Sequence, residues 1–351
     1  MAKKDKFRTN IGGQALIEGI MMRGPDKVAI VVRRPDKTLA IKEEPYIPLK
    51  QRNKLLGLPL VRGACSLVIS LISGMNALMW AAEQALDEDD KPKVTKKLEE
   101  TIEKLNEAEG AEKQETSESS DTAMGKMGVS KKEEKGIFVM AIILGLAIAV
   151  GLFIVLPNFL GGLLFNRFGE DVDRVYRVLF ETSVRVALLV LYMLAVSRMK
   201  DIQRTFSYHG AEHKAIACYE AGEPLTVENV TRHTRFHPRC GTSFLLMVML
   251  VSFGAFLLIE IPIRNYVDTG NLLIRSGIKL AILPLVVGVT YEINRYIGAH
   301  DNWFTRFLRA PGIWLQRITT NEPDESMIEI GIEALTCVLP SQQADAEWGK
   351  E

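Results

Sequence analysis

Two short segments of this 351-residue sequence carry four of its five histidines. His209 and His213 are four residues apart, so on a helix both imidazoles project from one face and can bind one metal ion. Glu212 directly precedes His213 and completes H-x-x-E-H, the inverted order of a zinc-protease signature. The sequence therefore predicts a zinc site at the two histidines. Glu212 is the expected general base, with a role as ligand or as orienter of the histidines left open.

A third ligand is needed, and the segment His237-Pro238-Arg239-Cys240 offers an imidazole and a thiolate. His233 is a weaker candidate, and Glu292 is another because proteases with the inverted signature take a glutamate from a later helix. If both His237 and Cys240 bind, four ligands favour a closed structural zinc; a single further ligand leaves an open catalytic position. In the second case zinc would lower the pKa of a bound water to about 7 and provide a hydroxide nucleophile.

Two acidic residues fall inside apolar segments, where an unpaired charge is costly. Glu260 and Glu292 are therefore further functional candidates, and Arg264 and Arg295 are their nearest expected partners. Two cations close to the histidines are expected to bind lipid headgroups or to extend to the membrane surface: Lys214 and Arg239.

The chain is 47% hydrophobic, and its apolar residues are concentrated in blocks. The clearest block runs from 137 to 160 without a charged residue, enough to cross a hydrocarbon core of about 30 Å at about 1.5 Å per residue. Three more candidate spans follow at 179–196, 241–263 and 274–295. We expect Arg177, Glu181 and Arg185 to pair along one helix face, and Lys279 to snorkel. The predicted fold is mainly α, a polytopic helical membrane protein with about four transmembrane helices.

Residues 58–86 are also apolar, with small residues recurring at helical steps. We expect a membrane-associated helix that is re-entrant or lies on the surface. The segment from 198 to 242 carries seven basic residues, against about three in each neighbouring loop, and positive charge stays in the cytoplasm. Four spans then place both termini and the His/Cys loop 199–242 of this multi-pass cell-membrane protein in the cytoplasm, whereas a fifth span would separate them.

Outside the spans, residues 27–33 and 38–44 are β-branched and partly alternating, which predicts a small β-hairpin in an N-terminal segment 1–57. The preceding glycine-rich stretch 11–25 matches no nucleotide-binding pattern and is expected to serve as a turn and packing segment. Residues 87–135, with 10 basic and 15 acidic side chains, form a charged flexible linker. A transmembrane domain at 136–297 then precedes cytosolic interfacial and amphipathic helices at 298–351.

Composition, cysteine usage and the start of the chain limit the expected partners and the cellular compartment. Lys+Arg and Asp+Glu are equal at 43 each, and the basic segments lack interleaved aromatic residues, so we expect no nucleic-acid partner. The four cysteines form no C-x-x-C pair, which argues for a reducing compartment. No apolar core follows the basic start of the chain at once, so no cleavable signal peptide is expected. The expected partner is the lipid bilayer, and homo-oligomerisation is compatible with the sequence.

Several motifs together resemble the YqhQ-type bacterial membrane proteins. They are Gly12-Gly13-Gln14-Ala15, Glu18-Gly19, Met21-Met22-Arg23-Gly24-Pro25, Tyr208 to Lys214, His237 to Thr242, and Arg309-Ala310-Pro311-Gly312. The resemblance covers nearly the whole chain apart from the acidic linker, and His233 is outside it. That family has no known function and carries only a general label of predicted metal-dependent enzyme. The resemblance therefore implies a membrane location and a metal more firmly than any reaction.

Three functions compete at this point. The first is a membrane-bound zinc hydrolase that acts on a peptide or lipid-linked substrate at the cytosolic interface. The second is a non-enzymatic membrane scaffold or assembly factor in which the metal is structural. The third, a transporter, rests on Glu260 and Glu292 alone.

Overall fold

The computed structural model describes residues 7–86, 140, 143–165, 173–263 and 271–348. The chain divides into two compact units, one of Met1–Ala85 with Phe153–Glu351 and one of Leu86–Leu152. Every contact discussed below lies within the first unit. The predicted charged linker at 87–135 lies outside the described residues.

The N-terminal element is a four-stranded antiparallel sheet in the order β1-β2-β3-β4. Its strands are β1 (Gly12–Leu16), β2 (Gly19–Arg23), β3 (Lys27–Arg33) and β4 (Leu39–Pro45). The predicted hairpin is β3 and β4, with Val31 opposite Ile41. The glycine-rich stretch, expected to form a turn and packing segment, supplies the first hairpin, with Gln14 opposite Met21. The β element is therefore twice as large as predicted.

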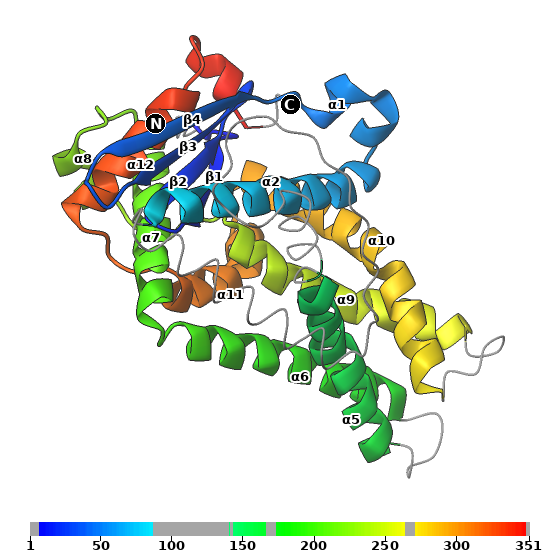
Figure 1. The fold of residues 1–351 in the computed structure, drawn as a ribbon. Helices are drawn as coiled ribbons and strands as arrows, with labels where there is room; N and C mark the ends of the chain where they lie inside the picture. The colour runs from blue at the N-terminus through cyan, green and yellow to red at the C-terminus, as the bar shows by residue number, and fades with distance from the viewer. Residues whose placement is uncertain (1–6, 87–139, 141–142, 166–172, 264–270, 349–351) are drawn as a thin grey trace, which may run out of the picture. The chain divides into compact units, whose positions relative to one another are not determined.

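Helices cover both faces of this sheet (Figure 1). On one face, Ile20, Met22 and Val31 pack against α7 (Lys200–Ala221) and α12 (Glu325–Val338). On the other face, Met21 and Ile30 pack with α2 (Val61–Ala85). β2 and β3 are therefore buried on both sides, which is why their sequences read as apolar runs with weak alternation.

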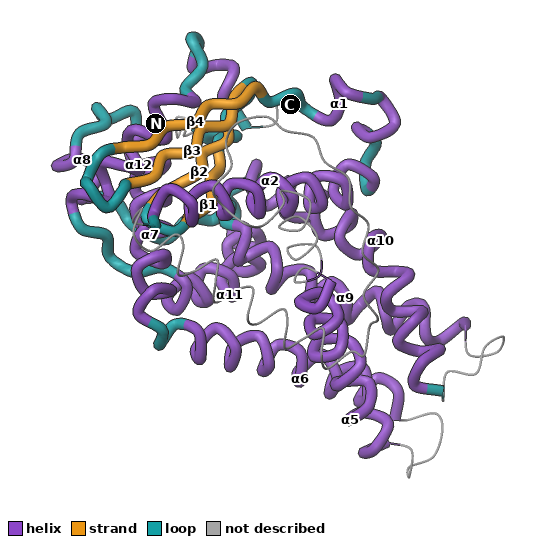
Figure 2. Tube along the Cα trace, in the orientation of Figure 1, coloured by secondary structure: helices purple, strands orange, loops and turns teal. Residues whose placement is uncertain are grey.

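The rest of the unit is helical (Figure 2). The short elements are α1 (Leu49–Arg52), the 3₁₀ turns η1 (Lys54–Gly57) and η3 (Gln343–Ala346), the π turn η2 (Gly151–Val155) and α8 (Val227–Arg232). The longer helices are α5 (Leu156–Phe165), α6 (Asp173–Val196), α9 (Gly241–Ile263), α10 (Leu272–Ala299) and α11 (Trp303–Thr319).

Five helices are long and apolar enough to cross a membrane: Val61–Ala85, Ile143–Phe165, Val175–Val196, Gly241–Ile259 and Leu272–Ala299. Leu163, Leu258 and Leu273 on three of them are 69%, 76% and 78% exposed, as expected for side chains that face lipid. The prediction of a mainly α, polytopic membrane protein with a small N-terminal β element is confirmed. The predicted count of about four spans is approximate, because α2 also qualifies by length and composition.

A buried charge cluster joins α5, α6 and α10. Glu181 is fully buried, and its carboxylate lies 2.5 Å from Lys279 Nζ and 3.0 Å from Arg275. The predicted pairing along α6 is also present, with Glu181 3.3 Å from Arg177 and 3.8 Å from Arg185. The prediction that Lys279 snorkels is wrong: its side chain is buried and also donates to Asn158 Oδ1 at 2.6 Å. Spacing along one helix cannot show an acidic partner on another.

Candidate metal centre

The predicted His/Cys loop 199–242 is mostly helical, and α7 carries the first two candidate ligands. α7 ends at Gly222, whose left-handed φ of 74° lets its N–H bond back to the carbonyls of Cys218 and Tyr219. Residues four apart share a helix face, so His209 and His213 lie side by side with ring centroids 4.4 Å apart. Because α7 packs against both the sheet and α12, this stretch of it is largely buried.

The third candidate ligand comes from a segment outside α7. Cys240 directly precedes α9 after a turn at Pro238 and Arg239. Its Sγ lies 3.2 Å from His209 Nε2. The donor atoms of His209, His213 and Cys240 all lie within 4.8 Å of one another. The structure thus joins three of the predicted ligands into one cluster.

Main-chain carbonyls fix the orientation of both imidazoles. His209 Nδ1 lies 2.9 Å from the carbonyl oxygen of Thr319, and His213 Nδ1 lies 2.6 Å from that of Arg235. A carbonyl only accepts hydrogen bonds, so each neutral ring carries its proton on Nδ1 and keeps a lone pair on Nε2. A second partner that fixes the tautomer in this way is typical of metal-binding histidines.

The spacing of the cluster fits zinc. Tetrahedral bonds of about 2.0 Å to nitrogen and about 2.3 Å to sulfur place two ligand atoms roughly 3.5 Å apart. The 3.2 Å between His209 Nε2 and Cys240 Sγ is close to that value. Two imidazoles and a thiolate are also ligands that zinc prefers. The three residues could therefore hold zinc and leave one tetrahedral position for another group.

Without a metal, the same residues form a thiolate–imidazolium pair. Burial opposes the charge on Cys240, but the imidazoles of His209 and His213 outweigh it and hold the pKa of Cys240 well below its usual value. Burial also opposes the charge on His209, yet the neighbouring thiolate raises the pKa of His209 to about 9. A thiolate is the form of cysteine that binds metals, so the lowered pKa favours the form of Cys240 that a metal needs.

The carboxyl group of Glu212 is buried beside the cluster. One of its oxygens, Oε2, has no hydrogen-bond partner among the residues that the structure describes. Burial raises the pKa of Glu212, while the charges of His213 and His209 and a hydrogen bond from the backbone of Gly13 lower it. A Cβ at Gly13 would lie 2.9 Å from Glu212 Cδ, so the glycine-rich strand β1 touches the candidate site.

His237 lies next to the cluster rather than in it. Its ring centroid is 5.4 Å from that of His213, but its Nε2 lies 3.2 Å from an Arg239 nitrogen. A guanidinium only donates hydrogen bonds, so Arg239 occupies the Nε2 lone pair of His237 that a metal would need. Burial and the Arg239 charge both hold the pKa of His237 well below its usual value. Arg239 in turn pairs with Glu220 of α7.

Two of the other predicted residues, Lys214 and Glu292, have structural partners. Lys214 is buried, donates to the Thr231 carbonyl at 2.9 Å and lies 2.9 Å from Glu322, so it links α7 to neighbouring segments. Glu292 accepts from Arg62 of α2 at 2.7 Å.

His233 pairs with Glu223 at 3.2 Å and forms a second group with that residue and Cys218. The side chain of Glu260, near the end of α9, and its expected partner Arg264 lie outside the described residues.

Glu220 is the residue near the site that the sequence motifs did not identify. It lies seven residues after His213, two helical turns along the same face of α7. Its carboxylate accepts from the backbone N–H of Thr9 at 2.7 Å and pairs with Arg239. Continuing the helical spacing beyond the H-x-x-E-H motif would have identified Glu220 from the sequence. The carbonyl groups of Thr319 and Arg235 that orient the two histidines belong to the main chain, so the side-chain types in the sequence could not predict them.

Comparison with known proteins gives a family without an assigned activity. Residues 58–341 match the family described as "Protein of unknown function (DUF1385)". The chain is also similar to "Uncharacterized protein YqhQ" of Bacillus subtilis (strain 168), with 29% identity over 338 residues, covering 96% of this chain and 94% of that protein. No solved structure matches. The family match covers well over half of the sequence, and the chain therefore belongs to the DUF1385 family.

Proposed function

We propose that this protein is a membrane-bound, zinc-dependent hydrolase whose site lies at the cytosolic face of the membrane. Its substrate class would be a peptide or a lipid-linked molecule. The observation that carries the proposal is the convergence of His209, His213 and Cys240, with both histidines oriented by main-chain carbonyls. The group contains three protein donors, which is the number found in catalytic zinc sites.

Each residue has a distinct role in this proposal. His209, His213 and Cys240 would hold the metal, and bound zinc would supply a Lewis acid that activates water near neutral pH. Glu212 would accept the proton of the attacking water, because its carboxylate is buried beside both histidines and Oε2 is not committed to another described group. Glu220 and Arg239 would position the turn that carries Cys240, through the contact of Arg239 with His237.

The first experiment measures metal content. Full-length protein purified in detergent should contain about one zinc per chain by elemental analysis, and the His209→Ala, His213→Ala double variant should contain none. A His300→Ala variant is the matched control, because His300 contacts the carbonyl of Tyr296 instead and should leave the zinc in place. Absence of metal from the wild type would end the proposal.

The second experiment separates a catalytic metal from a structural one. Glu212→Gln keeps the size of the side chain and removes the base, so it should retain zinc and abolish hydrolysis of any peptide or lipid-linked substrate that the wild type cleaves. The effect should be on the order of 10²- to 10⁴-fold. Full activity in the zinc-loaded variant would assign Glu212 a structural role.

One observation favours a structural metal in a membrane scaffold as the second candidate. His213 and Cys240 are 1% and 6% exposed, and the cluster links α7, the start of α9 and the end of α11. In that case removing the metal would lower the melting temperature, and Glu212→Gln would have no functional effect. The transporter hypothesis loses part of its basis, because Glu292 is paired with Arg62.

A further inference from the structure

Helix α11 lies at the ends of the candidate spans and has two different faces. Its inner face carries Leu315, which packs with Leu189 of α6 and Leu246 of α9. Leu189 lies seven residues before the end of α6 and Leu246 five residues after the start of α9, so these contacts place α11 beside the terminal two turns of both candidate spans. Asn302 caps the start of α11 through a reciprocal capping box with Thr305, so the helix has a fixed beginning at this level.

The outer face of α11 combines exposed aromatic and basic side chains. Trp303, Phe307 and Trp314 are 81%, 71% and 52% exposed, which is uncommon for such large apolar groups unless they meet another apolar phase. Aromatic rings at a helix surface near span ends are the usual anchors at the lipid headgroup level. The outer face therefore fits the interfacial layer of a bilayer.

An open groove of about 570 Å³ runs along this outer face. Arg306, Arg309 and Arg317 line it together with Phe307 and Trp314. Asp301 pairs with both Arg306 and Arg309. Arg317 is exposed and forms no ion pair with any residue that the structure describes. Three guanidinium groups and one carboxylate leave the groove with net positive charge beside aromatic surface.

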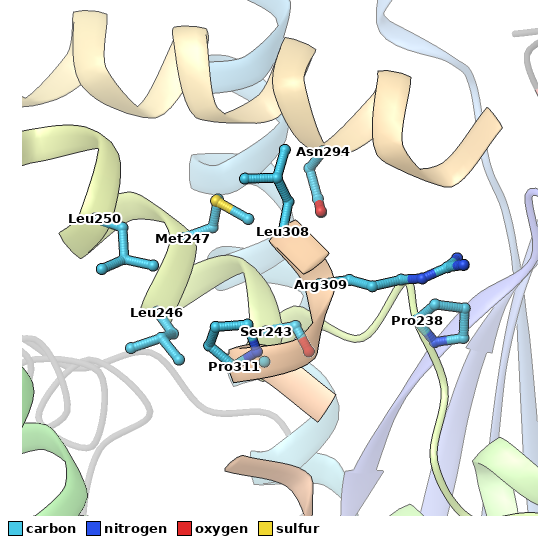
Figure 3. A pocket seen from close by; sticks show the side chains of 10 residues that line it. Pro238, Ser243, Leu246, Met247, Leu250, Asn294, Leu308, Arg309 and Pro311 are labelled. Carbon is cyan, nitrogen blue, oxygen red and sulfur yellow. The ribbon is translucent and has the colours of Figure 1, made fainter. Parts of the chain in front are cut away.

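We propose that this groove binds the phosphate of an anionic phospholipid. Arg317 contacts the phosphate, since guanidinium groups bind phosphate through paired hydrogen bonds. Arg306 donates to both oxygens of Asp301 through Nε and Nη2, so it adds its charge and its remaining N–H groups. Phe307 and Trp314 lie against the glycerol and the upper part of the acyl chains. Arg309 and Pro311 line both this groove and a separate small cavity of about 10 Å³, which Pro238 also lines (Figure 3).

Lipid binding to α11 is independent of metal chemistry but acts on the same helix. The inner face of α11 carries Gln316, which bonds to both the N–H and the carbonyl of His237, and the carbonyl of Thr319 orients His209. A lipid bound at Arg317 therefore fixes the level at which the candidate metal centre meets the bilayer. A water-soluble phosphate would satisfy the arginines but not the aromatic groups.

Native mass spectrometry of the full-length protein tests the proposal. Protein exposed in detergent to equal amounts of phosphatidylglycerol and phosphatidylcholine should retain mainly phosphatidylglycerol. An Arg306→Gln, Arg317→Gln variant should lose about tenfold in retention, the effect of roughly one charge-assisted hydrogen bond. Arg232→Gln is the matched control, because Arg232 is exposed on α8 and pairs with Glu228. Metal content should be unchanged in both variants, and His209→Ala should retain lipid as the wild type does.

Three results would overturn the proposal. The first is equal retention of the two lipids by the wild type. The second is unchanged phosphatidylglycerol retention in the double variant. The third is displacement of the lipid by millimolar inorganic phosphate, which would identify a free phosphate as the ligand.

Discussion

The carboxyl group of Glu212 can lie beside the candidate metal centre because Gly13 has no side chain. A Cβ at Gly13 would lie 2.7 Å from the carbonyl oxygen of Met21 and 2.9 Å from both Glu212 Cδ and Met22 Sδ. Such contacts are too short for real Cβ atoms, so the strand or the carboxylate must move. A Cβ at Gly12, one position earlier in β1, would have no atom within 4 Å.

This pair of glycines gives a matched test. Gly13→Ala should destabilise the protein by about 1–3 kcal/mol, the usual cost of overpacking. It should also weaken any activity that depends on Glu212. Gly12→Ala should leave both properties near wild type. Thermal unfolding in detergent, followed by circular dichroism, measures the first effect; equal melting temperatures for the two variants would contradict the packing described for β1.

Cys240 provides the second test at the scale of a residue, because sulfur ligation has a spectroscopic signature. Cobalt-loaded wild type should show a thiolate-to-metal charge-transfer band in the near ultraviolet. Cys240→Ser is nearly isosteric but lacks the thiolate, so it should lose the band and bind the metal more weakly. Cys65→Ser, on α2, should keep the band. Persistence of the band in Cys240→Ser would show that another cysteine binds the metal.

At the scale of elements, Glu181 holds α6 against α10. It is fully buried, and the two shortest of its contacts with basic groups reach α10, at Lys279 and Arg275. Removing one partner of a buried ion pair typically costs about 3–5 kcal/mol, because the remaining charge keeps its desolvation cost. Glu181→Gln should therefore lower the melting temperature strongly. Glu83→Gln, at an exposed position of α2, should not, and similar melting temperatures for the two variants would refute this role.

The sequence predicted those elements whose side chains follow one simple period. The β3–β4 hairpin was predicted because its two segments are rich in β-branched residues and partly alternate. The spans in α6, α9 and α10 were predicted from long apolar runs, and His209 and His213 from spacing within one helix. In each case the information lies within a single element.

The features that were not predicted depend on contacts between elements, which the sequence of a single segment does not reveal. β2 is covered on both faces, so its residues do not alternate and the first hairpin was not recognised. Glu292 pairs with Arg62, 230 positions away, and Lys279 pairs with Glu181 of another helix. His237 was an attractive ligand by type, but Arg239 occupies its Nε2. Predicting these partners requires the packing of the helices.

At the scale of the whole molecule, one shared core restricts how the chain can cross a bilayer. The sheet, α7 and α12 contribute to the same hydrophobic core, so they must lie on the same side of the membrane. From α7 to α12 the chain passes through α9 and α10, an even number of spans, and returns to that side. From β4 to α7 it passes three helices that qualify as spans: α2, the helix at 143–165, and α6. An odd number of crossings cannot return the chain to its starting side.

We therefore predict that α2 does not cross the membrane. Its Ala77 and Ala81 are buried against the sheet, so this end of the helix belongs to the same body as α7. The packing thus supports, by a separate argument, the re-entrant or surface-lying helix expected from the distribution of positive charge.

Cysteine labelling in intact cells measures this topology. The background would lack Cys65 and Cys337, because Cys218 and Cys240 are buried and should react poorly. With both termini cytoplasmic, a membrane-impermeant maleimide should label Asn271→Cys, at the start of α10, from outside. It should label Lys37→Cys in the β3–β4 turn, and Lys91→Cys after α2, only once the cells are permeabilised. Labelling of Lys91→Cys from outside would mean that α2 crosses. The parity of the chain would then require that either the helix at 143–165 or α6 does not.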